Sequence, residues 1–292
     1  MPVQLDYRSM TAPVGIVRFL EIFLSCTAFS LVAHVGQYSG TYGGWCMFTW
    51  CFSFAVSVLI IVLELTALYV KIPMSWDDFT ASFAMLATLM NLTASIIYPT
   101  IFLTSNNQHE AKDYKIAATA MSCLCFVAYA IEVGLTRAKP GEISGFLKTI
   151  PGLLKVLEAF IACIIFVLVE GSYWAYSGRQ WCMAVYCICF IITFLIIILT
   201  IAKLIARLPF PFERFLTVYN VLAVLMYISA AIIWPIFCFS KEYGSPTRPS
   251  SCERGHCLWD NQVIATVLTY ANLIVYIVDL VYSARLVFIA QA

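Results

Sequence analysis

Eight long apolar segments constrain this chain more than any other feature of its sequence. A helix needs about 20 apolar residues to cross a bilayer core of about 30 Å. A segment in lipid must satisfy its backbone hydrogen bonds internally, and these segments lack the alternation of barrel strands. We therefore predict an all-α polytopic membrane protein with eight transmembrane helices, at residues 16–37, 45–69, 79–103, 114–135, 151–171, 181–205, 215–239 and 261–289.

The composition agrees with a lipid environment. Apolar residues make up 62% of the 292 residues and charged residues only 11%, whereas a soluble domain is about half apolar and about a quarter charged. The net charge of +1 and the absence of a basic tract give no reason to expect nucleic-acid binding.

The distribution of Lys and Arg predicts that both termini are cytosolic, because cytosolic loops carry the excess of these residues. This topology places eleven on the cytosolic side and six on the outer side. The cytosolic set is Arg8, Arg18, Lys71, Arg137, Lys139, Lys148, Lys155, Lys203, Arg207, Arg214 and Arg285, and the outer set is Lys112, Lys115, Arg179, Lys241, Arg248 and Arg254.

The two halves of the chain repeat each other. Segments that begin at Pro13, Trp45 and Ile96 recur at Pro151, Trp181 and Ile232, an offset of 136 to 138 residues. Each half contains four predicted helices, so both halves enter the membrane in the same orientation, unlike inverted repeats. We predict a cytosolic tail at 1–12, a four-helix domain at 13–137, a basic linker at 138–149 and a second four-helix domain at 150–292.

Glutamate, aspartate and lysine side chains within the predicted helices gather toward the cytosolic leaflet, at Glu21, Glu64, Glu132, Glu158, Lys203 and Asp279. Two pairs, Arg18 with Glu21 and Lys155 with Glu158, are three residues apart and share a helix face. Two interpretations stay open: a belt of interhelical ion pairs, which we favour, and a proton or ion path, which would also need ionisable groups at mid-membrane. The predicted belt comprises Arg18, Glu21, Glu64, Glu132, Lys155, Glu158, Lys203, Asp279 and Arg285, with Arg137 and Arg285 as expected neighbours of Glu132 and Asp279.

Tyr98-Pro99 and Trp234-Pro235 near the outer helix ends predict a repeated kink, because proline frees a carbonyl one turn back. A gating hinge is the alternative. In the outer loop at 240–260, Cys252 and Cys257 favour a local disulfide. Unpaired thiols and a metal site with His256 are the alternatives.

Cations in the cytosolic loops are candidate contacts for anionic lipids or a protein partner. The ordinary orientation signal explains the same residues, which are Arg137, Lys139, Lys148, Arg207 and Arg214. The chain has three scattered histidines and no hydrolase, metalloprotease or phosphate-binding motif. We therefore predict no enzyme activity, metal or cofactor, and weigh an intramembrane acyltransferase only as a minor alternative.

The sequence resembles the myeloid-associated differentiation marker family, whose members carry two tandem MARVEL domains. The most specific segment is TRAKPGEI at 136–143, followed by PGLLKVLE at 151–158, and MFTWCF at 47–52 and ASIIYP at 94–99 support it. The resemblance implies two four-helix MARVEL-type bundles. The short N-terminal tail lacks the Ser/Thr-rich extension of some members.

The resemblance also implies a function as a membrane scaffold. Such a protein would organise cholesterol-rich raft domains of the plasma membrane and help to place a Rac-type small GTPase and actin-linked proteins. It would thereby influence cell spreading, migration and cell–cell junctions, and it could form a homo-oligomer. The alternative function is a transporter or channel that uses the intramembrane acids.

Overall fold

The computed structural model describes residues 10–36, 38, 40–103, 109–137, 147, 149–169, 175–204, 211–250, 252 and 257–289. It confirms the fold class, because the described part of the chain is helical without strands and contains eight helices long and apolar enough to cross a membrane. These helices are α2 (Pro13–Val35), α3 (Gly40–Leu65), α4 (Trp76–Tyr98), α5 (His109–Arg137), α6 (Ile150–Val169), α7 (Ser177–Ile201), α8 (Phe212–Phe239) and α9 (Leu258–Ile289).

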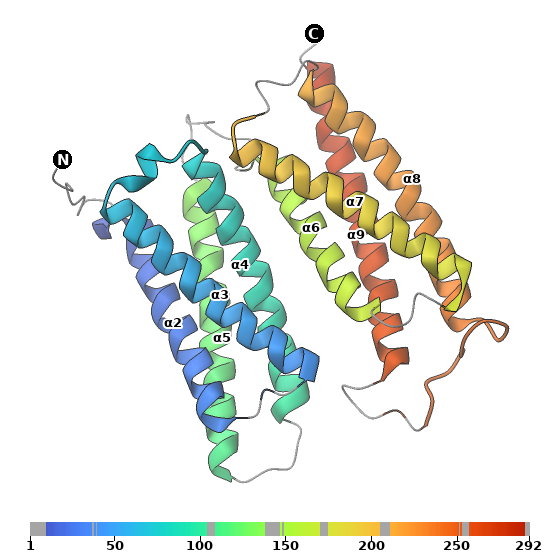
Figure 1. Ribbon diagram of the computed structural model, residues 1–292, viewed down its shortest axis with the longest axis horizontal. Coiled ribbons are helices and arrows are strands. Elements are labelled where there is room, and N and C mark those ends of the chain that lie inside the picture. Colours follow the sequence, from blue (N-terminus) through green and yellow to red (C-terminus); the bar gives the residue numbers. More distant parts are fainter. Residues whose placement is uncertain are drawn as a thin grey trace. The chain divides into compact units, whose positions relative to one another are not determined.

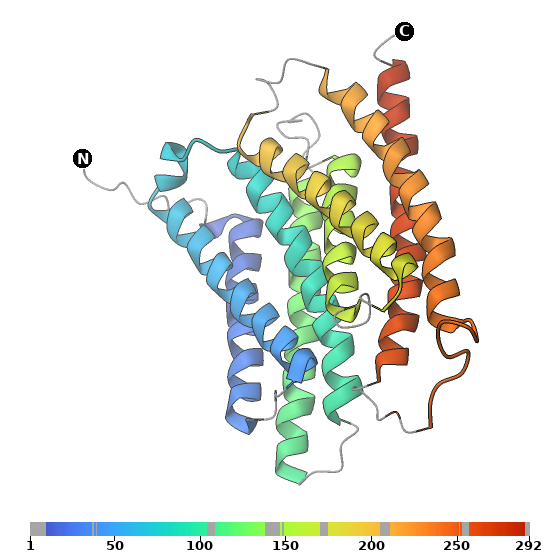
Figure 2. The same cartoon turned by 45° about the vertical axis from the view of Figure 1, so that its right-hand side comes forward.

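The chain divides into two compact units, Met1–Lys148 and Thr149–Ala292, each with four of these helices. In the first unit, α2 and α4 each pack against both α3 and α5, so the four helices form a closed ring. The second unit repeats this arrangement, with α6 and α8 each packed against α7 and α9. In both views, α3 and α7 run obliquely to the other helices of their own units (Figures 1 and 2).

Local sequence signals explain several helix ends. Pro13 occupies the first turn of α2, where a missing N–H costs nothing, and Gly36 ends the helix with φ 70°. The Gly36 amide donates to the carbonyl oxygens of Val32 and Ala33, which satisfies two otherwise free acceptors.

The structure differs from the prediction at the C-terminal end of α3. This helix ends at Leu65 rather than near residue 69, because Ala67 adopts a left-handed conformation with φ 52°. A short 3₁₀ helix, η1 (Leu68–Lys71), follows it.

The two helix prolines behave differently from each other. At Pro99 the α-helix α4 ends and a π-helical turn, η2 (Pro99–Leu103), continues the segment, because proline removes one backbone donor. Pro235 instead lies inside α8, which runs on to Phe239. The repeated proline therefore produces two local conformations rather than one repeated kink.

The internal duplication is visible in matching hydrogen bonds. Trp45 Nε1 of α3 donates to Thr93 Oγ1 of α4 at 3.2 Å, and Trp181 Nε1 of α7 donates to Ser229 Oγ of α8 at 3.0 Å. Each residue of the second bond lies 136 positions after its counterpart in the first (45 and 181, 93 and 229). The two units therefore share side-chain contacts as well as helix order.

A second matched contact crosses each ring between opposite helices. Trp50 Nε1 donates to Ser122 Oγ at 3.0 Å, and Tyr186 OH lies 2.8 Å from Thr269 Oγ1. The aromatic neighbours also correspond, since Trp50 meets the ring of Tyr98 edge-on in the first unit. Tyr186 meets Trp234 in the same way in the second.

Candidate functional site

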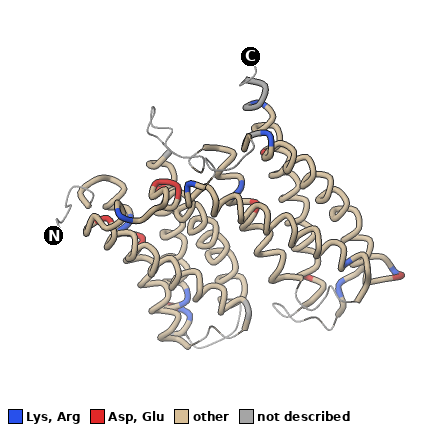
Figure 3. Tube along the Cα trace, turned by 45° about the horizontal axis from the view of Figure 1, so that its top comes forward, with Lys and Arg blue, Asp and Glu red and all other residues tan. Residues whose placement is uncertain are grey.

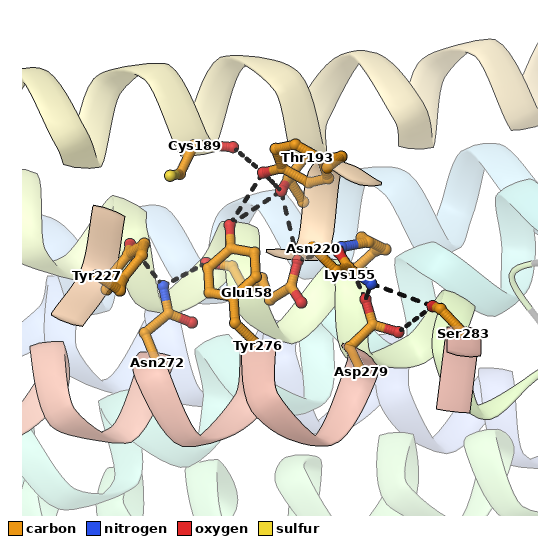
Figure 4. Close-up of polar contacts among 11 residues, drawn as sticks. Lys155, Glu158, Cys189, Thr193, Asn220, Tyr227, Asn272, Tyr276, Asp279 and Ser283 are labelled. Atoms are coloured by element: carbon orange, nitrogen blue, oxygen red, sulfur yellow. Dashed lines mark hydrogen bonds and ion pairs between the residues drawn. The ribbon is translucent and has the colours of Figure 1, made fainter. Parts of the chain in front are cut away.

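Lys155 is the centre of a buried polar cluster in the second unit (Figure 4). Its Nζ lies 2.7 Å from Asp279 Oδ2 and 2.9 Å from Glu158 Oε2, and it donates to Asn220 Oδ1 at 2.6 Å. The four side chains come from α6, α8 and α9 and are fully buried. Lys155 therefore links three helices of the unit.

Further hydrogen bonds hold the acids of this cluster in place. Asn220 Nδ2 donates to Asp279 Oδ2 at 2.9 Å and to Ser283 Oγ at 3.1 Å. Lys155 Nζ also lies 4.8 Å from the centre of the Tyr219 ring, within cation–π distance. A single ammonium group is thus surrounded by oxygens and aromatic faces (Figure 4).

The polar contacts continue toward the middle of the second unit. Thr193 Oγ1 lies 2.8 Å from Tyr219 OH and 3.1 Å from Tyr276 OH. Asn272 Nδ2 donates to Tyr227 OH at 2.8 Å. Such neutral interhelical hydrogen bonds stabilise helix packing in membranes by about 0.6 kcal/mol on average.

Arg18 has the corresponding role in the first unit. Its Nη1 binds both carboxylate oxygens of Glu64 at 2.6 Å, and its Nε binds Glu132 Oε1 at 2.6 Å. Trp76 Nε1 also donates to Glu64 at 2.9 Å. The guanidinium therefore joins α2 to α3 and α5, as its planar fork of donors allows.

Glu21 lies in the same region but has a different environment. Its side chain is fully buried, and neither carboxylate oxygen has a hydrogen-bond partner among the described residues, although Arg18, Ser57 and Glu132 lie near it. Beyond Glu21, Ser57 Oγ lies 2.8 Å from Tyr129 OH, which matches the contact of Thr193 with Tyr276 in the second unit.

The structure pairs the predicted belt residues differently from the sequence-based expectation. Arg18 binds Glu64 and Glu132 on other helices, although helical spacing suggested Glu21 as its partner. The expected neighbour of Asp279 was Arg285, yet Asp279 binds Lys155. Spacing along one helix identifies residues on a common face, but the interhelical contacts are set by packing.

Two residues do not belong to the buried belt, which corrects the prediction. Lys203 and Arg285 are exposed and make no ion pair with the residues that the structure describes. Lys203 lies just past the end of α7 with φ 56°, and Arg285 lies on an outward-facing part of α9. Both are long cations near helix ends, where such side chains reach water readily.

The predicted cytosolic contact residues lie mostly outside the described structure. Arg214 is exposed at the start of α8. The side chain of Arg137 and all of Lys139, Lys148 and Arg207 lie outside the described residues.

Sequence reasoning missed Asn220 and Trp76 as members of the two clusters. Asn220 lies between Tyr219 and Val221 in an otherwise apolar segment, and a lone amide in such a segment was a usable signal. Trp76 gave no signal beyond an aromatic at a helix start.

The loop between α8 and α9, predicted to lie on the outer side, contains a disulfide between Cys252 and Cys257. Arg248 Nε binds Asp260 Oδ1 at 2.8 Å, and this hydrogen bond raises the pKa of the Arg248 guanidinium above its ordinary value. Arg179 Nη2 also donates to the carbonyl oxygens of Phe237 and Tyr243. These contacts hold the described part of the loop against the start of α7, the end of α8 and the start of α9.

The clusters contain charged and hydrogen-bonding groups but no metal-binding arrangement, since no three His, Cys, Asp or Glu side chains of the described residues converge on one point. Charged residues are sparse along the helices of both units (Figure 3). The arrangement therefore suits internal attachment of helices to one another.

Comparison with known proteins agrees with the two-unit fold. The family model for MARVEL, described as a membrane-associating domain, matches residues 9–135 and again 146–282. No solved structure matches the chain.

Curated relatives match almost the whole chain. The myeloid-associated differentiation marker homolog of Xenopus laevis is 50% identical, covering 96% of this chain and 95% of its own. The human myeloid-associated differentiation marker-like protein 2 is 47% identical over 96% of this chain and 94% of its own, and the human myeloid-associated differentiation marker is 45% identical over 97% and 90%. The chain therefore belongs to the myeloid-associated differentiation marker family of membrane proteins with tandem MARVEL domains.

Proposed function

We propose that this protein is a non-enzymatic scaffold that organises cholesterol-rich domains of the plasma membrane. The observation that carries the proposal is the separation of polar and apolar groups in each unit. The charged groups deepest in the helices, such as Arg18 and Lys155, contact acids of the same unit, whereas large apolar side chains face outward.

The outward faces of the helices offer large apolar side chains to lipid. Val218 and Leu225 of α8 are 60% and 59% exposed, and Val267 and Ile274 of α9 are each 61% exposed. In water such a surface would favour aggregation, whereas acyl chains and sterols can cover it. We therefore expect the outward faces of these helices to contact mainly the acyl chains and sterols of the membrane.

A groove between α2 and α5 supports a specific lipid contact. It is open and has a volume of about 470 Å³. Its lining mixes apolar and polar side chains, which are Phe23, Cys26, Thr27, Ser30, Leu31 and His34 of α2 and Tyr114 of α5. The rings of His34 and Tyr114, 5.0 Å apart, lie along the same groove. Apolar side chains beside the hydroxyl groups of Thr27, Ser30 and Tyr114 suit a lipid that has one hydroxyl group and a rigid apolar body.

Purified protein in giant vesicles with coexisting liquid phases tests the proposal. We expect enrichment in the sterol-rich ordered phase, and a uniform distribution in vesicles made without sterol. Equal partition between phases at every sterol content would refute a scaffold for cholesterol-rich domains. Solute flux that needs Glu132 and Asp279 would instead support the transporter alternative.

The proposed scaffold would also recruit a Rac-type small GTPase to its cytosolic side and thereby act on spreading, migration and junctions. Basic residues such as Arg214, which is exposed, are the candidate contacts. Co-flotation of a purified GTPase with proteoliposomes tests this step. We expect binding to fall when Lys139, Lys148, Arg207 and Arg214 are changed to Gln, and to persist in the outer-loop control Arg248→Gln. If the GTPase binds both variants equally well, these basic residues do not form the proposed contact.

A further inference from the structure

One glutamate at the same repeat position in each unit has a carboxylate oxygen without a hydrogen-bond donor. Glu21 and Glu158 are 137 residues apart, as are Arg18 and Lys155. Both glutamates are 0% exposed. Both oxygens of Glu21 and Oε1 of Glu158 have no partner among the described residues. The unpartnered carboxylate oxygens therefore recur at corresponding positions of the internal repeat.

The cations of the two clusters are already occupied by other acids. Arg18 directs its Nη1 to Glu64 and its Nε to Glu132, and it makes no ion pair with Glu21 among the described residues. In the second unit, Lys155 is shared between Glu158 and Asp279. Counting formal charges, one guanidinium faces three carboxyl groups in the first cluster, and one ammonium faces two in the second.

An excess of negative charge in a bundle surrounded by lipid is unstable. Burial of an uncompensated carboxylate costs so much free energy that such a group normally becomes neutral instead. A buried water molecule could donate hydrogen bonds to the free oxygens, but it would leave the excess charge unchanged. A proton supplies a hydrogen-bond donor and lowers the excess negative charge by one. One proton neutralises the excess in the second cluster and reduces it from two charges to one in the first, where Glu64 is partly exposed.

We infer that Glu21 and Glu158 form a repeated pair of proton-binding sites, one inside each bundle, each held as a neutral carboxylic acid. The proton adds to one carboxylate oxygen and comes from water. Glu21 receives it because its oxygens have no donor, whereas Glu64 and Glu132 accept hydrogen bonds from Arg18. Glu158 receives it because only one of its oxygens contacts Lys155, whereas both oxygens of Asp279 have partners.

The groups that face these sites come from several helices. Around Glu21 they are Arg18 of α2, Ser57 and Glu64 of α3, and Cys125, Tyr129 and Glu132 of α5. Around Glu158 they are Lys155 of α6, Cys189 and Thr193 of α7, Tyr219 of α8, and Tyr276 and Asp279 of α9.

Infrared spectroscopy of the full-length protein in lipid nanodiscs tests this inference directly, because protonated carboxylic acids absorb apart from carboxylates. At neutral pH we expect carboxylic-acid bands in the unmodified protein. Glu21→Gln should remove one component, Glu158→Gln another, and the double variant both. The control Glu242→Gln, which changes an exposed acid of the outer loop, should leave the bands unchanged.

The infrared results can test the assignment of the protons to Glu21 and Glu158 even if one of the variants folds poorly. Absence of any carboxylic-acid band in the unmodified protein would overturn the inference without the use of a variant. A band that persists in Glu21→Gln and disappears in Glu132→Gln would place the proton on Glu132 and overturn the assignment to Glu21. Dicyclohexylcarbodiimide, which modifies neutral carboxyl groups in membranes, should label Glu21 in preference to Glu64 in peptide mass spectra.

Discussion

Substitution of Lys155 by Met removes the only cation of the described part of the second cluster and leaves the side-chain volume similar. Asp279 would lose its ion pair with Lys155 at 2.7 Å, and Glu158 Oε2 would lose the hydrogen bond that it accepts from Lys155 Nζ at 2.9 Å. The acids remain buried, and loss of one partner of a buried ion pair costs about 3–5 kcal/mol, because the other charge stays uncompensated. We expect the free energy of unfolding of the second unit to fall by about this amount.

Reversible unfolding in mixed micelles, followed by tryptophan fluorescence, measures the loss. Lys203→Met is the matched control, because it removes an exposed lysine of the same unit. We expect it to change the unfolding free energy by no more than about 0.5 kcal/mol. The double variant Lys155→Met with Asp279→Asn should lose less than the sum of the single variants, because the two residues contact each other. A loss below about 1 kcal/mol for Lys155→Met would contradict the buried cluster.

Three further predictions follow from the described contacts. Gly244→Ala should disturb the outer loop, because a Cβ there would overlap the carbonyl of Cys238, whereas Gly44→Ala meets open space; limited proteolysis from the outer side compares them. Cys252 and Cys257 should react with a membrane-impermeant maleimide only after reduction, and labelling without reductant would contradict the disulfide. Tyr129→Phe and Tyr276→Phe should each lower the unfolding free energy by about 0.6 kcal/mol per interhelical hydrogen bond lost. Tyr129 OH contacts Ser57 Oγ and Ser53 O, and Tyr276 OH contacts Thr193 Oγ1 and Tyr219 OH. A loss in only one of the two units would contradict their equivalence.

The fold was predictable from sequence because lipid imposes a simple rule on each segment. A run of about 20 apolar residues must be helical in a bilayer, whatever its neighbours are. The ends were harder, as α3 shows: the apolar sequence continues to Val70, but the helix stops at Leu65 where Ala67 takes a left-handed conformation. The apolar composition of the segment does not predict the left-handed backbone conformation at Ala67.

The sequence predicted which residues belong to the candidate site better than it predicted which of them contact each other. Depth along the helix indicated Arg18, Glu132, Lys155 and Asp279, because ionisable residues in apolar helices are rare and conspicuous. Their partners depend on how helices pack across the ring, and neither helical spacing nor charge selects Glu132 over Glu21 for Arg18.

The choice of cation in each half has a consequence for its partners. The first half uses an arginine, whose fork reaches a second acid, Glu64, and the second half uses a lysine, whose third contact is the amide of Asn220. At the corresponding positions, 136 residues apart, the second half has Thr200 in place of Glu64, and the first half has Ala84 in place of Asn220. The two halves therefore differ at the cation and at its partners together, and an arginine-to-lysine change alone in the first half would leave one of the two acids without its contact.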